Sequence, residues 1–266
     1  MSAAEIAGAS RGAMTRAMRT DVELEIAFAR DESVLLGALQ RACDGGTIRR
    51  GTPGAAVRVA PGTLHVMLVL ARLDCDEPKI LNRHVRPLLR ATGARYFGRD
   101  WIDLGGHPVA HVGFAHSRAT GRTVVEAFVA LSAPIAAGAR ASYLGKSPAT
   151  LHLDPESLAE KIVAAYGAPV VDSAPVAPAP ADEAPWAATV DEAIGPIHAG
   201  RDRAGRMRVG GEFMASVEAV TDLEDRIARG EDVRAAVDAA FGAPHTALFG
   251  VRSLDSFARA IQAASE

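Results

Sequence analysis

An arginine pair followed by a loop of small residues is the first group that could do chemistry. Arg49 and Arg50 precede Thr52, Gly54 and Ala55 in the run Arg-Arg-Gly-Thr-Pro-Gly-Ala. Guanidinium groups bind carboxylates and phosphates, and small residues let backbone N–H groups approach such an anion. We therefore treat these five residues as candidate ligand-binding residues. The alternative is structural: one arginine is exposed at the surface while the other hydrogen-bonds to carbonyl groups at a sheet edge.

A second polar group surrounds a predicted hairpin. Asp100 precedes a short apolar strand, a Gly-Gly turn leads to His107, and His111 follows four residues later. In a strand, His107 and His111 would share one face, about 13 Å apart at roughly 3.3 Å per residue. That distance is too long for one metal ion, so we predict no metal site here. Asp100 and His111 are candidate ligand-binding residues, and the histidines either line a polar pocket or are ordinary strand residues.

Lysine and cysteine are scarce. Lys79, Lys146 and Lys161 are the only lysines among 29 basic residues. Lys146 either approaches a pocket from its loop or is solvated there. The two cysteines, Cys43 and Cys75, lie in no metal-ligand spacing and are expected to be reduced thiols, as in a cytoplasmic protein.

The pattern of apolar residues predicts the elements that must position these groups. Alternating or continuous apolar runs predict strands at 21–30, 33–39, 47–52, 56–59, 63–73, 94–97, 101–104, 109–116 and 123–131. Helical periodicity predicts helices at 78–93 and 154–166, the second with Asp154 as N-cap and Gly167 at its end. Further along, we expect strands at 205–209 and 213–220 and helices at 221–229, 231–241 and 253–264.

A proline- and alanine-rich stretch divides the chain. Residues 168–186 are expected to form an extended linker between a domain at 21–167 and a smaller one at 187–266. Residues 1–20 are expected to be an N-terminal tail with some helix. The predicted fold class is α+β, with mixed and antiparallel sheets, packed helices and a small α+β C-terminal domain.

Several stretches, in their order and spacing, resemble the lipoate–protein ligase family of the biotin/lipoate-ligase fold. Phe28–Gln40 is similar to the family's strand–turn–strand, which ends in Gly-x-x-Gln. Arg49–Val57 is similar to its Arg-Arg-x-Ser/Thr-Gly-Gly-Gly-Ala-Val loop, and Asp100–His107 to the hairpin that leads to its catalytic lysine. Gly210–Met214 and the helices after it resemble the family's accessory domain.

The resemblance implies an acyl-adenylate site that this sequence does not fully reproduce. The family needs a glycine loop around the adenylate, a lysine that stabilises charge, and an apolar tunnel for the acyl tail. Here His107 stands at the lysine position, and the glycine triplet is Pro53-Gly54-Ala55. The cysteine used by acyl-transferring relatives has no counterpart near Thr123–Glu126. This pattern indicates a pseudoenzyme.

We therefore predict a binding or scaffold protein that engages a lipoyl-type carrier domain, another protein partner or an acyl ligand. The alternative is an active lipoyl or octanoyl transferase, or a lipoate–protein ligase, with His107 as a substituted catalytic residue. Lipoate, octanoate or a nucleotide would be ligands only if activity is retained. The net charge of −3 argues against a nucleic-acid partner, and no apolar run is long enough to span a membrane.

Overall fold

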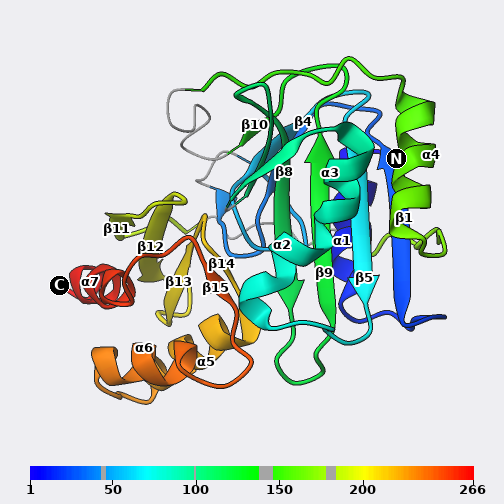
Figure 1. Cartoon of the computed structure of the whole chain (residues 1–266). Helices are drawn as coiled ribbons and strands as arrows, with labels where there is room; N and C mark the ends of the chain where they lie inside the picture. Colours follow the sequence, from blue (N-terminus) through cyan, green and yellow to red (C-terminus); the bar gives the residue numbers. More distant parts are fainter. Residues whose placement is uncertain (43–45, 99, 138–145, 178–183) are drawn as a thin grey trace.

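A six-stranded antiparallel sheet forms the centre of the larger unit in the computed structural model, which describes residues 1–42, 46–98, 100–137, 146–177 and 184–266 (Figure 1). The strands lie in the order β1 (Val22–Phe28), β5 (Leu64–Leu70), β9 (Thr123–Val129), β8 (His107–His116), β7 (Trp101–Leu104) and β6 (Arg95–Gly98). Every residue of β5 and β9 is buried, because both faces of the sheet are covered.

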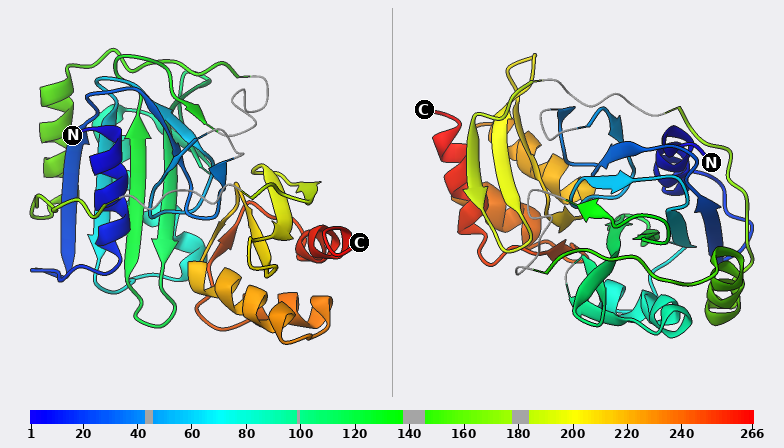
Figure 2. Two further views of the ribbon diagram at one scale, coloured as in Figure 1. Left: turned by 180° about the vertical axis from the view of Figure 1, so that it is seen from behind. Right: turned by 90° about the horizontal axis from the view of Figure 1, so that it is seen from above.

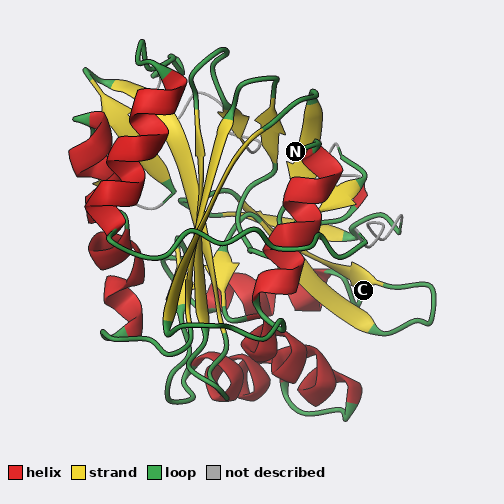
Figure 3. Ribbon diagram, turned by 90° about the vertical axis from the view of Figure 1, so that its right-hand side faces the viewer, coloured by secondary structure: helices red, strands yellow, loops and turns green. Residues whose placement is uncertain are grey.

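Helices cover one face of this sheet (Figure 3). They are the 3-10 turn η2 (Glu77–Lys79) and the helices α2 (Ile80–His84), α3 (Arg86–Thr92) and α4 (Pro155–Tyr166). The single helix predicted at 78–93 is thus divided, with Pro87 in the first turn of α3. The predicted boundaries of α4 are confirmed: the Asp154 side chain accepts a hydrogen bond from Ser157 N, and Gly167 ends the helix in the left-handed conformation.

The opposite face is covered by the N-terminal helix α1 (Ala3–Ala13) and by a small sheet (Figure 2). That sheet has the order β10 (Ala136–Ala137), β4 (Val57–Val59), β2 (Ser33–Leu36) and β3 (Ile48–Arg49). The helix expected within residues 1–20 is α1, but the segment is packed and is not a tail, since Ile6, Ala7 and Ala13 are completely buried. Most of the buried residues of α1 are alanine, glycine or serine, and such small residues give only a weak apolar pattern in the sequence.

The C-terminal unit combines a three-stranded sheet, a two-stranded sheet and three helices. In chain order these are β11 (Ala188–Asp191), β12 (Pro196–Arg201), β13 (Met207–Gly211), β14 (Met214–Ala215), α5 (Val217–Ala228), α6 (Val233–Phe241), β15 (Leu248–Phe249) and α7 (Asp255–Ala263). The strand predicted at 213–220 was wrong beyond Ala215, because α5 begins at Val217. The sequence reading also missed β11 and β12.

The described part of the linker packs against the larger unit. Leu24 N donates to Pro169 O and Val171 N donates to Leu24 O, so the chain pairs with the outer side of β1. A Cβ on Gly8 of α1 would lie 2.2 Å from Val176 O, which shows how closely the linker crosses that helix. Within the described ranges, no helix is both long and apolar enough to cross a membrane.

Candidate functional site

The arginine loop, residues 49–56, joins β3 to β4 and lies over the face of the central sheet that α1 and the small sheet cover. Gly37 lets the loop approach, since a Cβ there would come within 2.0 Å of Gly54 O. Gln40 fixes the turn before it, because its Oε1 accepts a hydrogen bond of 2.8 Å from Gly37 N. The Gly-x-x-Gln pattern therefore has a local structural role in holding the loop down.

Arg50 is the centre of the loop, and its side chain is completely buried. Its Nε donates to Thr52 Oγ1 at 2.8 Å. Its Nη1 donates to Leu35 O at 3.2 Å and Ala55 O at 2.9 Å, and its Nη2 donates to Pro53 O at 3.4 Å. The guanidinium thus holds two carbonyl groups of the loop and that of Leu35 on β2. These donors are not available to an anionic ligand in this conformation.

Glu126 on β9 balances the charge of Arg50. Its Oε2 lies 3.2 Å from Arg50 Nε and also accepts a hydrogen bond from Thr52 Oγ1, while its Oε1 lies 2.8 Å from His65 Nε2 on β5. Burial alone would raise the pKa of Glu126, but the hydrogen bond and charge of His65, together with Arg50 and Thr52, lower it below its ordinary value. The carboxylate is therefore held ionised inside the fold.

His111 on β8 lies beside this ionic cluster and is also fully buried. Its Nε2 is 3.4 Å from Asp100 Oδ2, a contact that is not aligned as a hydrogen bond, and neither ring nitrogen has a hydrogen-bond partner among the described residues. Burial is the main cause that lowers the pKa of His111, so the ring is neutral at neutral pH. Trp101 packs against it with the two rings nearly perpendicular and their centroids 5.6 Å apart.

The structure separates His107 from this cluster. His107 begins β8, is exposed, and its Nδ1 lies 3.0 Å from Ser147 O. On the same hairpin, Asp103 Oδ2 lies 3.2 Å from Lys146 Nζ. The chain thus brings a lysine to the hairpin from another loop, but pairs it with a carboxylate.

The arginine loop packs against the C-terminal unit. Gly54 adopts a φ of +113°, which disfavours any side chain, and a Cβ there would lie 3.4 Å from Met214 Cγ. Gly211 N donates to Leu39 O at 3.0 Å, so β13 is joined to the turn before the loop. The C-terminal unit therefore packs on the loop that the sequence singled out.

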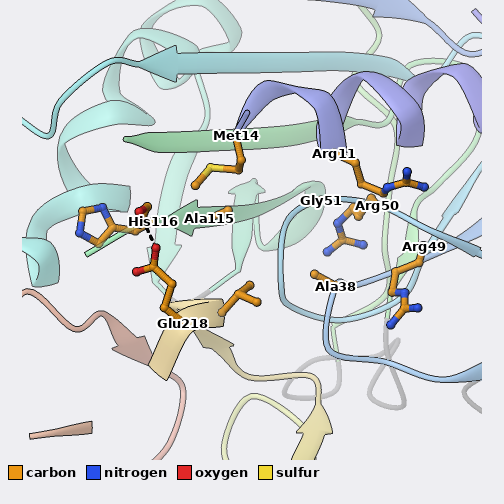
Figure 4. Close-up of a pocket in the computed structure, with 11 residues that line it drawn as sticks. Arg11, Met14, Ala38, Arg49, Arg50, Gly51, Ala115, His116 and Glu218 are labelled. Carbon is orange, nitrogen blue, oxygen red and sulfur yellow. Dashed lines mark hydrogen bonds between the residues drawn. The ribbon is translucent and has the colours of Figure 1, made fainter. Parts of the chain in front are cut away.

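A pocket of about 380 Å³ lies where α1, the arginine loop, the end of β8 and the start of α5 meet (Figure 4). Arg49 and Gly51 line it from the loop and Met14 from the end of α1. Glu218 lines it from α5 and accepts hydrogen bonds from Ser117 Oγ at 2.5 Å and Arg118 N at 2.7 Å. The lining is mainly apolar, with arginines toward one end (Figure 4). Of the candidate residues in the loop, Arg49 and Arg50 reach this pocket.

The structure thus gathers Arg50, Thr52, Asp100 and His111, all predicted, and leaves His107 apart. Sequence reasoning missed His65 and Glu126. The signal was present, because each is a titratable residue inside an otherwise apolar strand, Leu-His-Val-Met-Leu-Val-Leu and Thr-Val-Val-Glu-Ala-Phe-Val. Such residues are rarely buried without a partner.

Comparisons with known proteins place this arrangement in a known fold. No family model matches the sequence, and no curated protein matches it. The structure is similar to P. falciparum LipL1 in complex with lipoate, with a TM-score of 0.59, 9% identity, and coverage of 95% of this chain and 89% of that chain. The chain has the fold of the lipoate–protein ligases.

Two further structures with this fold each match about two thirds of the chain. The bipartite lipoate protein ligase of Thermoplasma acidophilum, studied with its E2 lipoyl domain, gives a TM-score of 0.52 and 13% identity over 65% of this chain and 84% of that chain. A lipoate-protein ligase A bound with ATP gives a TM-score of 0.51 and 16% identity over 64% of this chain and 85% of that chain. The predicted α+β class and the predicted resemblance to the ligase fold are confirmed.

Proposed function

We propose that this protein is a lipoate–protein ligase-like protein that does not activate acyl groups and acts in the cytoplasm as a binding or scaffold protein. Its partner is a lipoyl-type carrier domain or another protein. The observation that supports this most directly is the buried pair of Arg50 and Glu126 beneath the loop. Together with the hydrogen bonds of Arg50, it directs the guanidinium donors to protein oxygens, whereas the resemblance implies that this loop surrounds an adenylate.

The chemistry of adenylation explains why this pair matters. Stabilising a developing charge on an acyl phosphate needs donors that point at the ligand before the reaction. In this loop the Arg50 donors point at protein oxygens, and Pro53 supplies no N–H group. At the lysine position His107 supplies an imidazole in place of the ammonium group that the resemblance implies for stabilising the developing charge.

The carrier domain is favoured as a partner by the retained architecture. The Thermoplasma ligase, which shares the fold, was studied with its E2 lipoyl domain. In this chain the C-terminal unit remains docked on the loop through Gly211 and Met214 although the lysine is absent. A protein surface built from both units can be retained for binding after catalysis is lost.

The test is to incubate the protein with ATP, a lipoyl carrier domain and either lipoate or octanoate. We expect no acyl-AMP and no mass increase of the carrier, together with saturable binding of the carrier in a calorimetric titration. A catalytic ligase is the positive control. Carrier modification at a rate comparable to that control would establish the alternative, an active ligase with a substituted site. Absence of both modification and carrier binding would direct the search to another protein partner.

A further inference from the structure

A cysteine, a histidine and an aspartate converge at the end of the loop that follows β5, on the far side of the sheet from the arginine loop. Asp74 Oδ1 lies 3.1 Å from His84 Nε2, and Cys75 Sγ lies 3.9 Å from the same nitrogen. All three potential ligand atoms lie within 4.8 Å of one another. Among the described residues, no other group of histidine, cysteine and carboxylate side chains converges in this way.

We propose that Asp74, Cys75 and His84 form a binding site for a zinc-type divalent metal ion, with water in the fourth position. A tetrahedral zinc site with bonds of about 2.0–2.3 Å places neighbouring ligand atoms roughly 3.3–3.6 Å apart. The two separations to His84 Nε2 lie on either side of that range. Side-chain shifts of roughly half an ångström would bring these two separations into the range. The third separation, between the Asp74 carboxylate and Cys75 Sγ, is at most 4.8 Å.

The ligand set selects the metal by its chemistry. Thiolate and imidazole favour zinc over magnesium or calcium, which prefer oxygen ligands. Three protein ligands and an open position are typical of zinc sites that keep a bound water. The site is also accessible, because the Asp74 side chain is half exposed and Cys75 is partly exposed.

Neighbouring residues already orient the three side chains. Arg83 Nη2 donates to Asp74 Oδ2 at 2.7 Å, which turns the other carboxylate oxygen toward His84. Tyr166 Oη donates to His84 O at 2.8 Å and so fixes the end of α2. Hydrogen bonds that orient a metal ligand in this way are a regular feature of metal sites.

The binding test uses Co²⁺ as a spectroscopic probe and Zn²⁺ as its competitor. We expect one equivalent of Co²⁺ to give a thiolate-to-metal charge-transfer band that Zn²⁺ abolishes. The band should persist in Cys43→Ser, which keeps Cys75, and disappear in Cys75→Ser. Asp74→Asn should weaken Zn²⁺ binding at least about tenfold, because even indirect partners of metal ligands contribute this much.

The matched control is Asp76→Asn, which removes a neighbouring exposed carboxylate that pairs with Lys79 rather than with the cluster. We expect unchanged Zn²⁺ affinity in this variant. As an independent measurement, Zn²⁺ should protect Cys75 from alkylation, followed by peptide mass spectrometry. Absence of a charge-transfer band in the unmodified protein, or a band that survives Cys75→Ser, would overturn the proposal. Neither outcome depends on whether the protein binds a carrier domain.

Discussion

Arg50 Nε on the loop and Glu126 Oε2 on β9 lie 3.2 Å apart, with both side chains removed from solvent. Two charges have therefore been placed inside the fold at a desolvation cost that their mutual attraction and hydrogen bonds must offset. The pair links the small sheet to the central sheet. It makes the closed conformation of the loop a part of the folded core.

Replacing Glu126 with glutamine should be strongly destabilising. The Arg50 guanidinium would then lose its nearest counter-charge while remaining buried, and breaking a buried pair typically costs about 3–5 kcal/mol. Denaturant unfolding followed by circular dichroism measures this loss. Arg58→Met is the matched control, because the Arg58–Glu32 pair is 60% exposed on each side and should contribute no more than about 1 kcal/mol. Similar losses in the two variants would show that the buried pair does not stabilise the fold.

Stability should fall as the pH drops below the ordinary histidine pKa of 6.5, in part because of His111. Burial lowers the pKa of His111 in the folded state, with Asp100, Arg50 and Glu126 as the charged groups that face it. The unfolded chain then binds more protons than the folded chain below pH 6.5, so acid favours unfolding. His111→Gln should reduce the slope of stability against pH between about 5 and 7. An unchanged slope would assign the effect to His84 and His116, whose pKa values burial also lowers.

Restoring lysine with His107→Lys should not restore acyl activation. We expect this because the Arg50 donors would still be bound to carbonyl oxygens and Pro53 would still offer no N–H group to a ligand. Release of pyrophosphate in the presence of ATP and octanoate is the measurement, with the unmodified protein as its background. Activity in this single variant would show that the missing lysine, rather than the closed loop, is what prevents catalysis.

Glu218→Ala should loosen the contact between the two units. The variant removes the acceptor of Ser117 Oγ and Arg118 N, both part-buried, and we expect a loss below the roughly 1–3 kcal/mol that a fully buried unpaired donor costs. Hydrogen exchange at residues 117–121 should become faster. Asp225→Ala is the control on the same helix, because Asp225 pairs with Arg206 inside the C-terminal unit. Equal effects of both variants would mean that α5 is destabilised as a whole.

The sequence predicted the central strands and α4 well, because each combines a clear apolar pattern with a cap or turn. It placed the helix α1 in a tail, because the small alanines on its buried face give a weak apolar pattern. It also extended the strand at β14 into α5, which follows almost directly. Arg50, Thr52, Asp100 and His111 were found by their motifs. Glu126 and His65 were missed because their role arises from pairing between strands that are distant in sequence.

The pairing of Leu24 with Pro169 and Val171 has a consequence for where the larger unit ends. β1 is an outer strand of the central sheet, and an uncovered outer strand is a template for intermolecular pairing. The linker covers the outer side of β1 with a segment that contains Pro169. Because proline has no N–H group to donate, this segment is a poor template for a further strand. A fragment that stops at Gly167 would uncover this edge. Pro169 and Val171 of the linker therefore protect the sheet against aggregation, in addition to connecting the two units.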